Sequence, residues 1–336
     1  MIRPAVEPQI LPRPAVRVAV IGGGQNCEHD VSLASAASVA AALDPTAYDV
    51  VRLTIGRDGQ WIDEYGSPVG LAGAVEIIQG CGVVLPIVHG PLGEDGALAA
   101  LCELAGVPYA GSGVRAGALA MDKWATKLVA EAVGVATAPG RLVTRAQTVV
   151  ETVPWTGPVV VKPVAAGSSH GVSLVRMRSE LAPALAAAFS LDDRVLIEDL
   201  IVGREVDVAV VTLPDGERVV GPALEIVCAE LFDTTMKYDG SADFRLPADL
   251  DDVPRKELEQ AALAVYDALG CAGVARVDFF VTQDGPVLNE VNTMPGMTAE
   301  SQVPKMFAAA GLPYPALLDL LVRGALADNP VAADDP

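Results

Sequence analysis

Residues 275–296 read ARVDFFVTQDGPVLNEVNTMPG, in which two runs of alternating polar and apolar residues flank the turn sequence QDGP. This arrangement predicts an antiparallel β-hairpin. Because side chains alternate between the two faces of a strand, we expect the apolar members of both runs on one face and the polar members on the other. The expected apolar face consists of Val277, Phe279, Val281, Val287 and Val291.

The polar face of this hairpin carries opposed acids. With the turn centred on Asp284, Asp278 lies opposite Glu290 and Arg276 opposite Asn292. Directly opposed residues have Cβ atoms about 5 Å apart, and two carboxylates at that distance repel unless a cation neutralises them. Two carboxylates and an amide oxygen are hard ligands of the kind that Mg²⁺ combines with water and phosphate oxygens. The hairpin therefore predicts a magnesium site; the alternative is a solvated face that carries its charges by chance.

The composition of the 336-residue chain limits the classes of function. Its formal net charge of −20 argues against nucleic acid and anionic membranes as partners, because both bind clustered Lys and Arg. No uninterrupted apolar run approaches the ~18 residues of a membrane span. Residues 1–15 hold four prolines and no signal-type apolar stretch, so we expect a disordered leader and a cytoplasmic protein. Five widely spaced cysteines without a CxxC pair fit reduced thiols.

The N-terminal third has the pattern of a parallel sheet. Residues 17–24, RVAVIGGG, predict a buried strand entering a glycine turn, and the Ala-rich segment after the turn has helical spacing. The turn GGGQNC does not match the dinucleotide fingerprint GxGxxG. Glu28, where the turn meets the helix, is expected either to cap the helix or to bind an ammonium group. His89 and Glu94 follow the next buried strand, at the kind of strand end where open α/β sheets place ligands.

The middle of the chain has the pattern of a phosphate site. Residues 159–163, VVVKP, predict a buried strand that ends at Lys162, and the loop VAAGSSHGV follows it. A lysine there is costly to bury without an anion, and the loop supplies N–H groups and hydroxyls for phosphate oxygens; the alternative is a lysine that extends to solvent. The Walker pattern GxxxxGK[ST] does not occur in the chain. Residues 116–135 predict one amphipathic helix, and the long polar segment 229–250 predicts a lid.

Eight motifs in sequence order resemble those of the D-alanine-D-alanine ligase family of the ATP-grasp superfamily. They are GGGQNCEHDVS, VHGPLGEDG, YAGSGVRAGALAMDK, VVVKP with GSSHGV, VLIEDLIVGREV, MKYDG, ARVDFF and NEVNTMPGMTAES. The resemblance runs from about Arg17 to Leu321 and implies an α/β protein, α+β in its ATP-grasp part. The expected division is a leader (1–15), an N-terminal parallel-sheet domain (16–120), a central ATP-grasp subdomain (121–200), a C-terminal ATP-grasp subdomain (201–325) with the lid 229–250, and a tail (326–336).

The resemblance also implies roles for single residues at the positions that match the family's motifs. Asp278, Glu290 and Asn292 match the ligands of two Mg²⁺ ions, for which Mn²⁺ can substitute, in agreement with the hairpin. Lys123 and Lys162 match residues that bind the ATP phosphates, and Glu198 and Glu205 match residues on the adenine and ribose side. Glu28 matches the residue that binds the first ammonium group and is linked through Ser168 to Tyr238, and His89 matches a residue beside the first substrate. Arg276 and the Gly296 N–H match the groups that stabilise the oxyanion, and Lys237 and Ser301 match the groups that bind the second carboxylate.

The activity implied by the resemblance is ATP-dependent joining of two D-alanines for peptidoglycan precursors. The first carboxylate becomes an acyl phosphate, and the amine of the second D-alanine attacks it. The implied partners are D-alanine and ATP, and the implied assembly is a homodimer. The alternatives are a sibling ATP-grasp ligase with another acceptor, such as D-serine, in resistance or specialised peptide synthesis, and a catalytically silent nucleotide-binding protein.

Several residues depart from the family's common pattern; they leave the ATP and metal machinery unaffected and concern the second substrate. Retention of Lys237 and Tyr238 favours an amino acid over D-lactate as the acceptor. The departures are Ala165 and Ala166 before GSS, His170 after it, Thr235 before the Lys-Tyr pair, and Gln302 and Val303 after Ser301.

Overall fold

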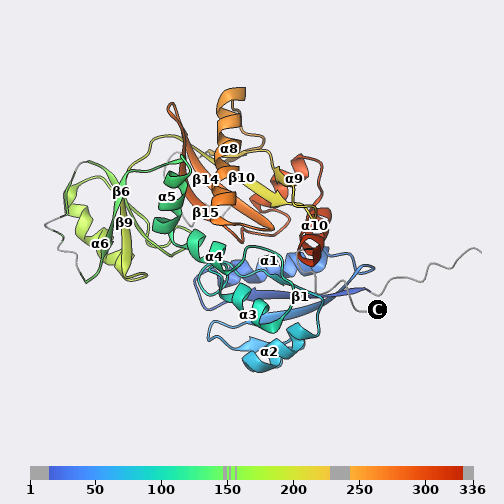
Figure 1. Ribbon diagram of the computed structural model, residues 1–336. Helices are drawn as coiled ribbons and strands as arrows, with labels where there is room; N and C mark the ends of the chain where they lie inside the picture. Colours follow the sequence, from blue (N-terminus) through green and yellow to red (C-terminus); the bar gives the residue numbers. More distant parts are fainter. Residues whose placement is uncertain (1–14, 147–149, 151–152, 156, 228–242, 328–336) are drawn as a thin grey trace, which may run out of the picture.

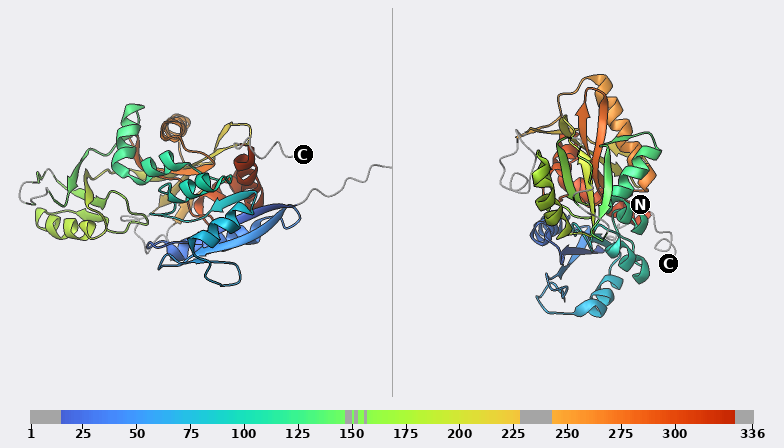
Figure 2. Two further views of the ribbon diagram at one scale, coloured as in Figure 1. Left: turned by 60° about the horizontal axis from the view of Figure 1, so that its bottom comes forward. Right: turned by 90° about the vertical axis from the view of Figure 1, so that its left-hand side faces the viewer.

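Three β-sheets divide the protein into three lobes. The structure, a computed structural model, describes residues 15–146, 150, 153–155, 157–227 and 243–327. In Figure 1 the N-terminal lobe is blue, the small middle lobe yellow-green and the lobe that carries the predicted hairpin orange. In the left view of Figure 2 the middle lobe projects away from the other two. Free cysteines account for all described cysteines, in agreement with the prediction of reduced thiols.

The N-terminal sheet is built on a strand that is buried on both faces. Its elements are β1 (Val16–Gly23), α1 (His29–Ala42), β2 (Tyr48–Ile55), β3 (Trp61–Ile62), α2 (Gly70–Gln79), β4 (Val83–Pro86) and α3 (Ala97–Ala105). The strand order is β3-β2-β1-β4, and β1 runs parallel to β2 and β4, as predicted. Val18 and Val20 of β1 face a core with α1 and with α10 (Tyr314–Ala327), whereas Ala19 and Ile21 face a core with α2 and α3. This double coverage is typical of parallel strands.

The largest sheet carries the hairpin. Its strands are β5 (Ala136–Thr137), β10 (Arg204–Thr212), β11 (Arg218–Val220), β12 (Leu224–Val227), β13 (Asp243–Arg245), β14 (Val274–Thr282) and β15 (Gly285–Asn292). Their order is β13-β12-β10-β14-β15-β5, with β11 on β10. Helix α8 (Asp252–Leu269) covers one face, in front of the sheet in Figure 1. Part of the other face packs on α9 (Gln302–Ala309) and α10, and the rest is left open for a site.

The acids at the centre of the hairpin pair as predicted. Asp278 lies opposite Glu290, and Arg276 lies opposite Asn292. The apolar face packs into the core beneath α8, where Val277, Phe279 and Val291 are buried. Directly opposed side chains share a face, so the two acids are held on the open side of the sheet.

A β-bulge sets this register, because the turn is not where the sequence predicts it. The last pair before the loop is Thr282 with Gly285, so the turn centres between Gln283 and Asp284 rather than on Asp284. Asn289 is an extra residue of β15, since its two neighbours pair with consecutive residues of β14. An insertion of this kind bends the strand and re-aims a side chain.

The same bulge makes the prediction for Val287 wrong. Val287 pairs with Phe280, which lines a cavity on the open face. Leu288 takes the expected place of Val287 in the core with α8. Each residue of β15 between the turn and the bulge therefore points to the side of the sheet opposite to the one expected for a regular hairpin.

The middle sheet presents one lysine and one acid toward the large sheet. It contains β6 (Gly140–Thr144), β7 (Val159–Pro163), β8 (Ser173–Val175) and β9 (Arg194–Asp199) in the antiparallel order β6-β9-β7-β8. Val161 and Ile197 pack with α6 (Leu181–Phe189), which follows a short 3₁₀ helix, η2 (Arg178–Glu180). Lys162 and Glu198 occupy alternate positions, so they point to the opposite side.

The predicted single helix over residues 116–135 is divided in two. Helix α4 (Val114–Met121) ends at Asp122, and α5 (Lys123–Ala132) begins directly after it. Asp122 has an extended backbone, and its side chain accepts a hydrogen bond from the N–H of Ala125 at 2.9 Å, which caps α5. A capping acid in the middle of a helical pattern competes with helix continuation. The break places Lys123 at the start of a new helix.

No single described helix is long and apolar enough to cross a membrane. Helices α9 and α10 reach the required length and hydropathy only as a pair, and a bend of 103° separates them.

We expect Asp122→Ala to lower the free energy of unfolding by about 1–2 kcal/mol, because it removes the cap of α5 and an ion pair with Arg194. Asp122→Asn keeps an oxygen for the Ala125 N–H and is expected to lose less. Urea denaturation measures both variants. An alanine variant as stable as the wild type would contradict the capping role.

Candidate active site

Two cavities meet on the polar face of the hairpin. The first, here called the lysine cavity, has a volume of about 330 Å³ and is lined by Lys123 and Lys162 among others. The second, here called the Glu28 cavity, has a volume of about 600 Å³ and lies between the start of α1 and the turn after β15. Of the residues that the structure describes, Arg276 and Glu290 alone line both cavities. Ligands in the two cavities would therefore reach the same two charged side chains.

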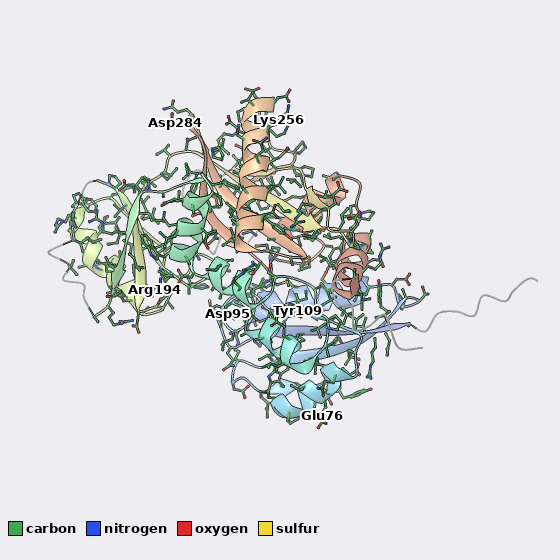
Figure 3. All side chains as sticks on the ribbon, viewed as in Figure 1. Glu76, Asp95, Tyr109, Arg194, Lys256 and Asp284 are labelled. Carbon is green, nitrogen blue, oxygen red and sulfur yellow. The ribbon has the colours of Figure 1, made fainter. Side chains whose placement is uncertain are left out.

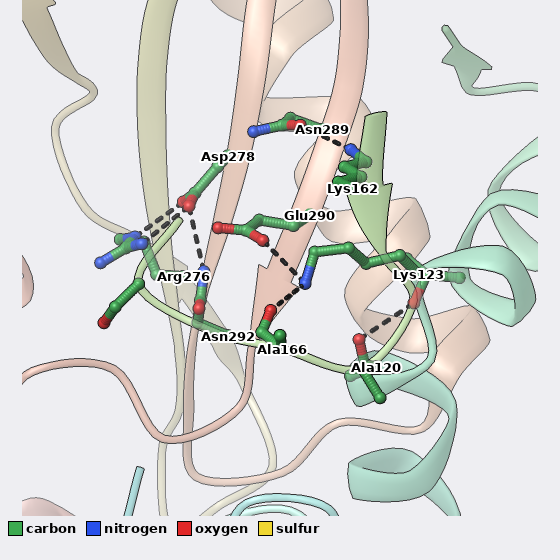
Figure 4. A network of polar contacts seen from close by, with 12 residues as sticks. Ala120, Lys123, Lys162, Ala166, Arg276, Asp278, Asn289, Glu290 and Asn292 are labelled. Carbon is green, nitrogen blue, oxygen red and sulfur yellow. Dashed lines mark hydrogen bonds and ion pairs between the residues drawn. The ribbon is translucent and has the colours of Figure 1, made fainter. Parts of the chain in front are cut away.

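Asp278 is held by three hydrogen bonds from its own hairpin (Figure 4). Arg276 donates from Nε to Oδ1 and from Nη2 to Oδ2, both at 2.7 Å, and Asn292 donates to Oδ2 at 3.0 Å. Asp207 on β10 adds a second carboxylate, 3.4 Å from the Nε of Arg276. Burial lowers the pKa of Arg276, but Asp278 and Asp207 outweigh burial and raise it well above its ordinary value. Arg276 therefore stays charged.

Glu290 points at the ammonium group of Lys123. The Nζ of Lys123 lies 3.2 Å from Oε2 of Glu290 and donates to the carbonyl of Ala166 at 2.8 Å (Figure 4). Lys123 is 8% exposed, so its charge needs nearby acceptors. Helix α5, the hairpin and the Gly/Ser loop after β7 thus converge on the ammonium group of Lys123.

The chemistry of the hairpin donors fits Mg²⁺. Asp278, Glu290 and Asn292 offer hard oxygen ligands on one face, and a carboxylate oxygen can bind a cation while it accepts a hydrogen bond. Within the described ranges, no group of three or more His, Cys, Asp or Glu could enclose a metal ion. These three donors therefore suit a cation that takes its remaining ligands from phosphates and water. They do not form the closed set of protein ligands that is typical of structural zinc or calcium sites.

Glu198 joins two buried lysines at the end of the lysine cavity. Its Oε1 lies 2.7 Å from the Nζ of Lys127, and its Oε2 lies 2.7 Å from the Nζ of Lys162. Lys127 also donates to the carbonyl of Ala138, and Lys162 donates to Oδ1 of Asn289 at 3.2 Å. Burial raises the pKa of Glu198, but the two lysines outweigh burial and hold it below its ordinary value. The three charges leave a net positive end that favours an anionic ligand.

Glu28 is bound by the Gly/Ser loop and does not cap α1. Its Oε1 accepts a hydrogen bond from the Oγ of Ser168 at 2.5 Å, and its side chain makes no cap hydrogen bond. Ser168 has a φ of 50°, an uncommon value for a residue with a side chain. A Cβ at Gly167 would lie 2.2 Å from Oε2 of Glu28, and one at Gly90 would lie 2.5 Å from it. A side chain at either glycine would therefore displace this carboxylate.

His89 lies in the wall of the Glu28 cavity with both ring nitrogens in contact with protein groups. Nδ1 lies 2.6 Å from the carbonyl oxygen of Met294, and Nε2 lies 3.0 Å from the Oγ of Ser35. The side chain is 4% exposed. Burial is the main reason that the pKa of His89 lies below its ordinary value, so the ring is neutral at neutral pH.

Glu94, a strand-end candidate in the sequence, is partly buried and lines the same cavity. Its Oε2 accepts a hydrogen bond from the N–H of Gly90 at 3.0 Å. Burial, followed by repulsion from Glu28, raises the pKa of Glu94 to about 8. The carboxyl group is therefore largely protonated at neutral pH, unlike an ordinary glutamate.

The remaining predicted residues are divided between the cavities and the part of the chain that is not described. Glu205 lines the lysine cavity, and Gly296 and Ser301 line the Glu28 cavity. The Oγ of Ser301 accepts from the N–H of Thr298 at 3.0 Å. Lys237 and Tyr238 lie outside the described residues, as do most of the predicted lid, the leader and the tail.

Several site residues are missing from the sequence prediction, among them Asp207, which contacts Arg276. Lys127 follows Lys123 by one helical turn, a spacing that could have revealed it. Gln302 accepts from Nη1 of Arg276 at 2.8 Å, and the sequence marks it only as a departure from the family pattern. Asn289 reaches Lys162 because of the bulge, for which strand alternation gives no signal.

Comparison with known proteins gives one consistent result. The family model "D-ala D-ala ligase C-terminus" matches residues 130–323, and "D-ala D-ala ligase N-terminus" matches residues 17–72 and 70–112. The D-alanine-D-alanine ligase of Mycolicibacterium smegmatis is 39% identical, over 93% of this chain and 95% of its own. The VanG D-Ala:D-Ser ligase of Enterococcus faecalis superposes with a TM-score of 0.80 at 32% identity, covering 93% of this chain and 100% of its own. The Bacillus anthracis D-alanine-D-alanine ligase complexed with ATP superposes with a TM-score of 0.78 at 29% identity, covering 95% and 100%.

We expect Lys127→Met to lower the free energy of unfolding by about 3 kcal/mol, because Oε1 of Glu198 and the carbonyl of Ala138 lose their donor in the buried interior. Lys256→Met, at an exposed position on α8 (Figure 3), is the matched control and is expected to change stability by less than about 0.5 kcal/mol. Chemical denaturation of both variants measures the difference. Equal stability of the two variants would refute the proposed contribution of the Lys127–Glu198 pair to the free energy of unfolding.

The raised pKa of Glu94 predicts a pH dependence of stability. The folded protein binds a proton at Glu94 up to a pH of about 8, whereas the unfolded chain releases it near 4.5, so this group reduces stability as pH rises between these values. Glu94→Gln removes that loss and is expected to gain stability over the wild type from pH 6 to pH 8. Glu76→Gln, on the outer face of α2 (Figure 3), is the control. A constant difference between Glu94→Gln and wild type across this range would contradict the assignment.

Proposed function

The chain belongs to the D-alanine-D-alanine ligase family of ATP-grasp enzymes and joins two D-alanines in an ATP-dependent step of peptidoglycan synthesis, and on that premise we propose which residues perform each part of the reaction. One observation carries the proposal. Arg276 and Glu290 line both cavities, so a nucleotide in the lysine cavity and an amino acid in the Glu28 cavity meet at the polar face of the hairpin.

ATP binds in the lysine cavity with its phosphates toward Lys123 and Lys162. The position of Lys123 beside Glu290 at the hairpin supports this orientation, because a triphosphate carries several negative charges. Glu198 and Glu205 lie on the adenine and ribose side. Apolar lining from Phe280 and other residues of the cavity offers a surface for the base.

Two Mg²⁺ ions, or Mn²⁺ in their place, are held by Asp278, Glu290 and Asn292. The donor set fits such ions, as described above, and the opposed acids would otherwise repel each other and the triphosphate. When bound, the ions neutralise phosphate oxygens and orient the terminal phosphate.

The first D-alanine binds in the Glu28 cavity, with its ammonium group on Glu28 and with His89 as part of the wall. Ser168 orients the Glu28 carboxylate. One oxygen of the substrate carboxylate attacks the γ-phosphorus of ATP in line, and ADP leaves. The product is an acyl phosphate. Phosphate is a good leaving group, whereas a free carboxylate would have to expel oxide or hydroxide. Lys123 stays beside Glu290 and offsets the charge that develops on the transferred group.

The second step forms the amide bond. The neutral amine nitrogen of the second D-alanine attacks the carbonyl carbon, the tetrahedral oxyanion collapses, and phosphate leaves with the proton that the nitrogen loses, as hydrogen phosphate. Arg276 and the Gly296 N–H stabilise the oxyanion, and each donor of this type is typically worth ~3 kcal/mol. Ser301 and Lys237 hold the second carboxylate, and Tyr238 closes the lid through Ser168 and Glu28.

We also propose the domain division 16–120, 121–200 and 201–325, a homodimer and a cytoplasmic location. The three separate sheets support the division. Membership of the family is the support for the assembly and the location.

The test of the activity is phosphate release by the purified protein with ATP, Mg²⁺ and a panel of acceptors, followed by product masses. We expect D-alanyl-D-alanine from D-alanine alone, and no dipeptide from L-alanine. A product found only when D-serine is added would favour the sibling ligase with another acceptor. No phosphate release with any D-amino acid would overturn the proposal.

We expect Glu290→Gln to lower D-alanine-dependent phosphate release by at least ~100-fold, because it removes a carboxylate that faces both substrates and the metal. Asp284→Asn changes an acid at the exposed tip of the same hairpin (Figure 3) and is expected to leave the rate unchanged. The measurement is steady-state phosphate release over a range of Mg²⁺ concentrations. Wild-type turnover in Glu290→Gln would reject the metal-ligand assignment.

A further inference from the structure

A chain of buried hydrogen bonds joins α1, the end of β4 and the turn after β15. The N–H of Met297 lies 3.2 Å from the Oγ of Ser35, this Oγ lies 3.0 Å from Nε2 of His89, and Nδ1 of His89 lies 2.6 Å from the carbonyl oxygen of Met294. Ser35 and His89 are 0% and 4% exposed. The links span up to 262 positions of the sequence, so this network fixes three distant segments to each other.

The partners determine the direction of every bond in the chain. A carbonyl oxygen only accepts, so Nδ1 of His89 carries the proton toward Met294. The Met297 N–H only donates, so the Ser35 oxygen accepts from it. The Ser35 hydroxyl then has its own proton available for Nε2 of His89, which accepts as the unprotonated nitrogen of a neutral ring. Each donor in the chain has one acceptor, and a neutral His89 is the form that satisfies all of them.

The two ends of this network carry the groups proposed for the two substrates. Met294 and Met297 bracket Gly296, whose N–H is proposed for the oxyanion. Helix α1 begins directly after Glu28, which is proposed for the first ammonium group. Ser32, one turn before Ser35, extends the same network, because its Oγ accepts from the N–H of His89 at 3.0 Å and donates to the carbonyl of Glu28 at 3.1 Å.

We propose that Ser35 is a positioning residue, which acts through His89 to fix the Gly296 turn relative to Glu28. The proposal rests on the function proposed above and assigns no contact between Ser35 and the reacting atoms. A displacement of about 1 Å in a catalytic group can cost on the order of 100-fold in rate. Loss of the Ser35 hydroxyl leaves the Met297 N–H and Nε2 of His89 without their partner in the buried interior, which favours a rearranged turn.

The proposal predicts which step of the reaction is sensitive. Gly296 serves the tetrahedral oxyanion of the second step, whereas the first step uses the lysine cavity, the face of the hairpin and Glu28, which Ser32 and Ser168 hold without Ser35. A loosened turn therefore slows amide formation and leaves transfer of the γ-phosphate intact. A serine with a merely structural role would lower thermal stability, or slow both steps together.

The experiment compares the two steps in Ser35→Ala and in Ser38→Ala. Ser38 lies one turn further along α1 and also contacts the next segment, through the N–H of Ala299 at 3.3 Å and the hydroxyl of Tyr314 at 3.2 Å, without contact to His89. Positional isotope exchange in ATP labelled with ¹⁸O at the β–γ bridging oxygen measures, with D-alanine present, reversible acyl phosphate formation. Dipeptide formation, followed by mass, measures the complete reaction.

We expect Ser35→Ala to lower the dipeptide turnover number about 10-fold to 100-fold, with isotope exchange and the KM for ATP within about twofold of the wild type. Ser38→Ala is expected to match the wild type in both. Equal dipeptide turnover in Ser35→Ala and wild type, or a parallel fall of exchange and turnover, would overturn the role of Ser35. Ser35→Cys, which keeps a weak donor of similar size, replaces the alanine variant if that variant does not fold, with the same expected split and the same contrary outcomes. A wild type that makes no dipeptide would refute the proposed function itself, independently of Ser35.

Discussion

The opposition of Asp278 and Glu290 across one antiparallel hairpin is the constraint on which the rest of the site depends. Two carboxylates on adjacent strands repel each other, and the surrounding structure supplies cations from different segments: Arg276 from the same strand and Lys123 from the start of α5. The acids also mark the boundary between two cavities of different character. One side gathers lysines, and the other gathers Glu28 and a protonated Glu94. A phosphate donor and an amino acid with a free ammonium group are therefore attracted to opposite sides of the same pair of strands.

Local breaks in regular structure deliver these side chains. The cap at Asp122 interrupts a long helical pattern so that Lys123 stands at a helix start beside Ala166 and Glu290. The backbone of Ser168, with its φ of 50°, brings a hydroxyl to Glu28. Neither conformation is the one that the sequence locally prefers. In both places hydrogen bonds to other segments maintain the less common geometry, as is frequent at functional sites.

Much of the fold and of the site could be predicted from the sequence, for identifiable reasons. The acid pairing was predictable because the face of a side chain follows directly from strand alternation, and the strand that ends at Lys162 was predictable from its unbroken apolar run. The ionic cluster around Glu198 was not, because Lys127 looks like any polar residue on an amphipathic helix until the fold buries it. The position of the turn was predicted incorrectly, and the register at the acids was nevertheless right. Asn289 accounts for both results, since the residue added by the bulge compensates for the displaced turn.

The bulge at Asn289 has a consequence for how this hairpin tolerates changes in length. If residue 289 were removed, the two strands would pair without interruption from the turn onward. Glu290 would then follow Leu288 directly and would remain across from Asp278. The cost would fall on Lys162, which would lose its amide neighbour. If a residue were instead removed at the tip, Thr282 would pair with Pro286, and a regular ladder without a bulge would again place Glu290 across from Asp278. Deletions at either place are thus expected to keep the two acids opposed, because the added residue and the displaced turn offset each other.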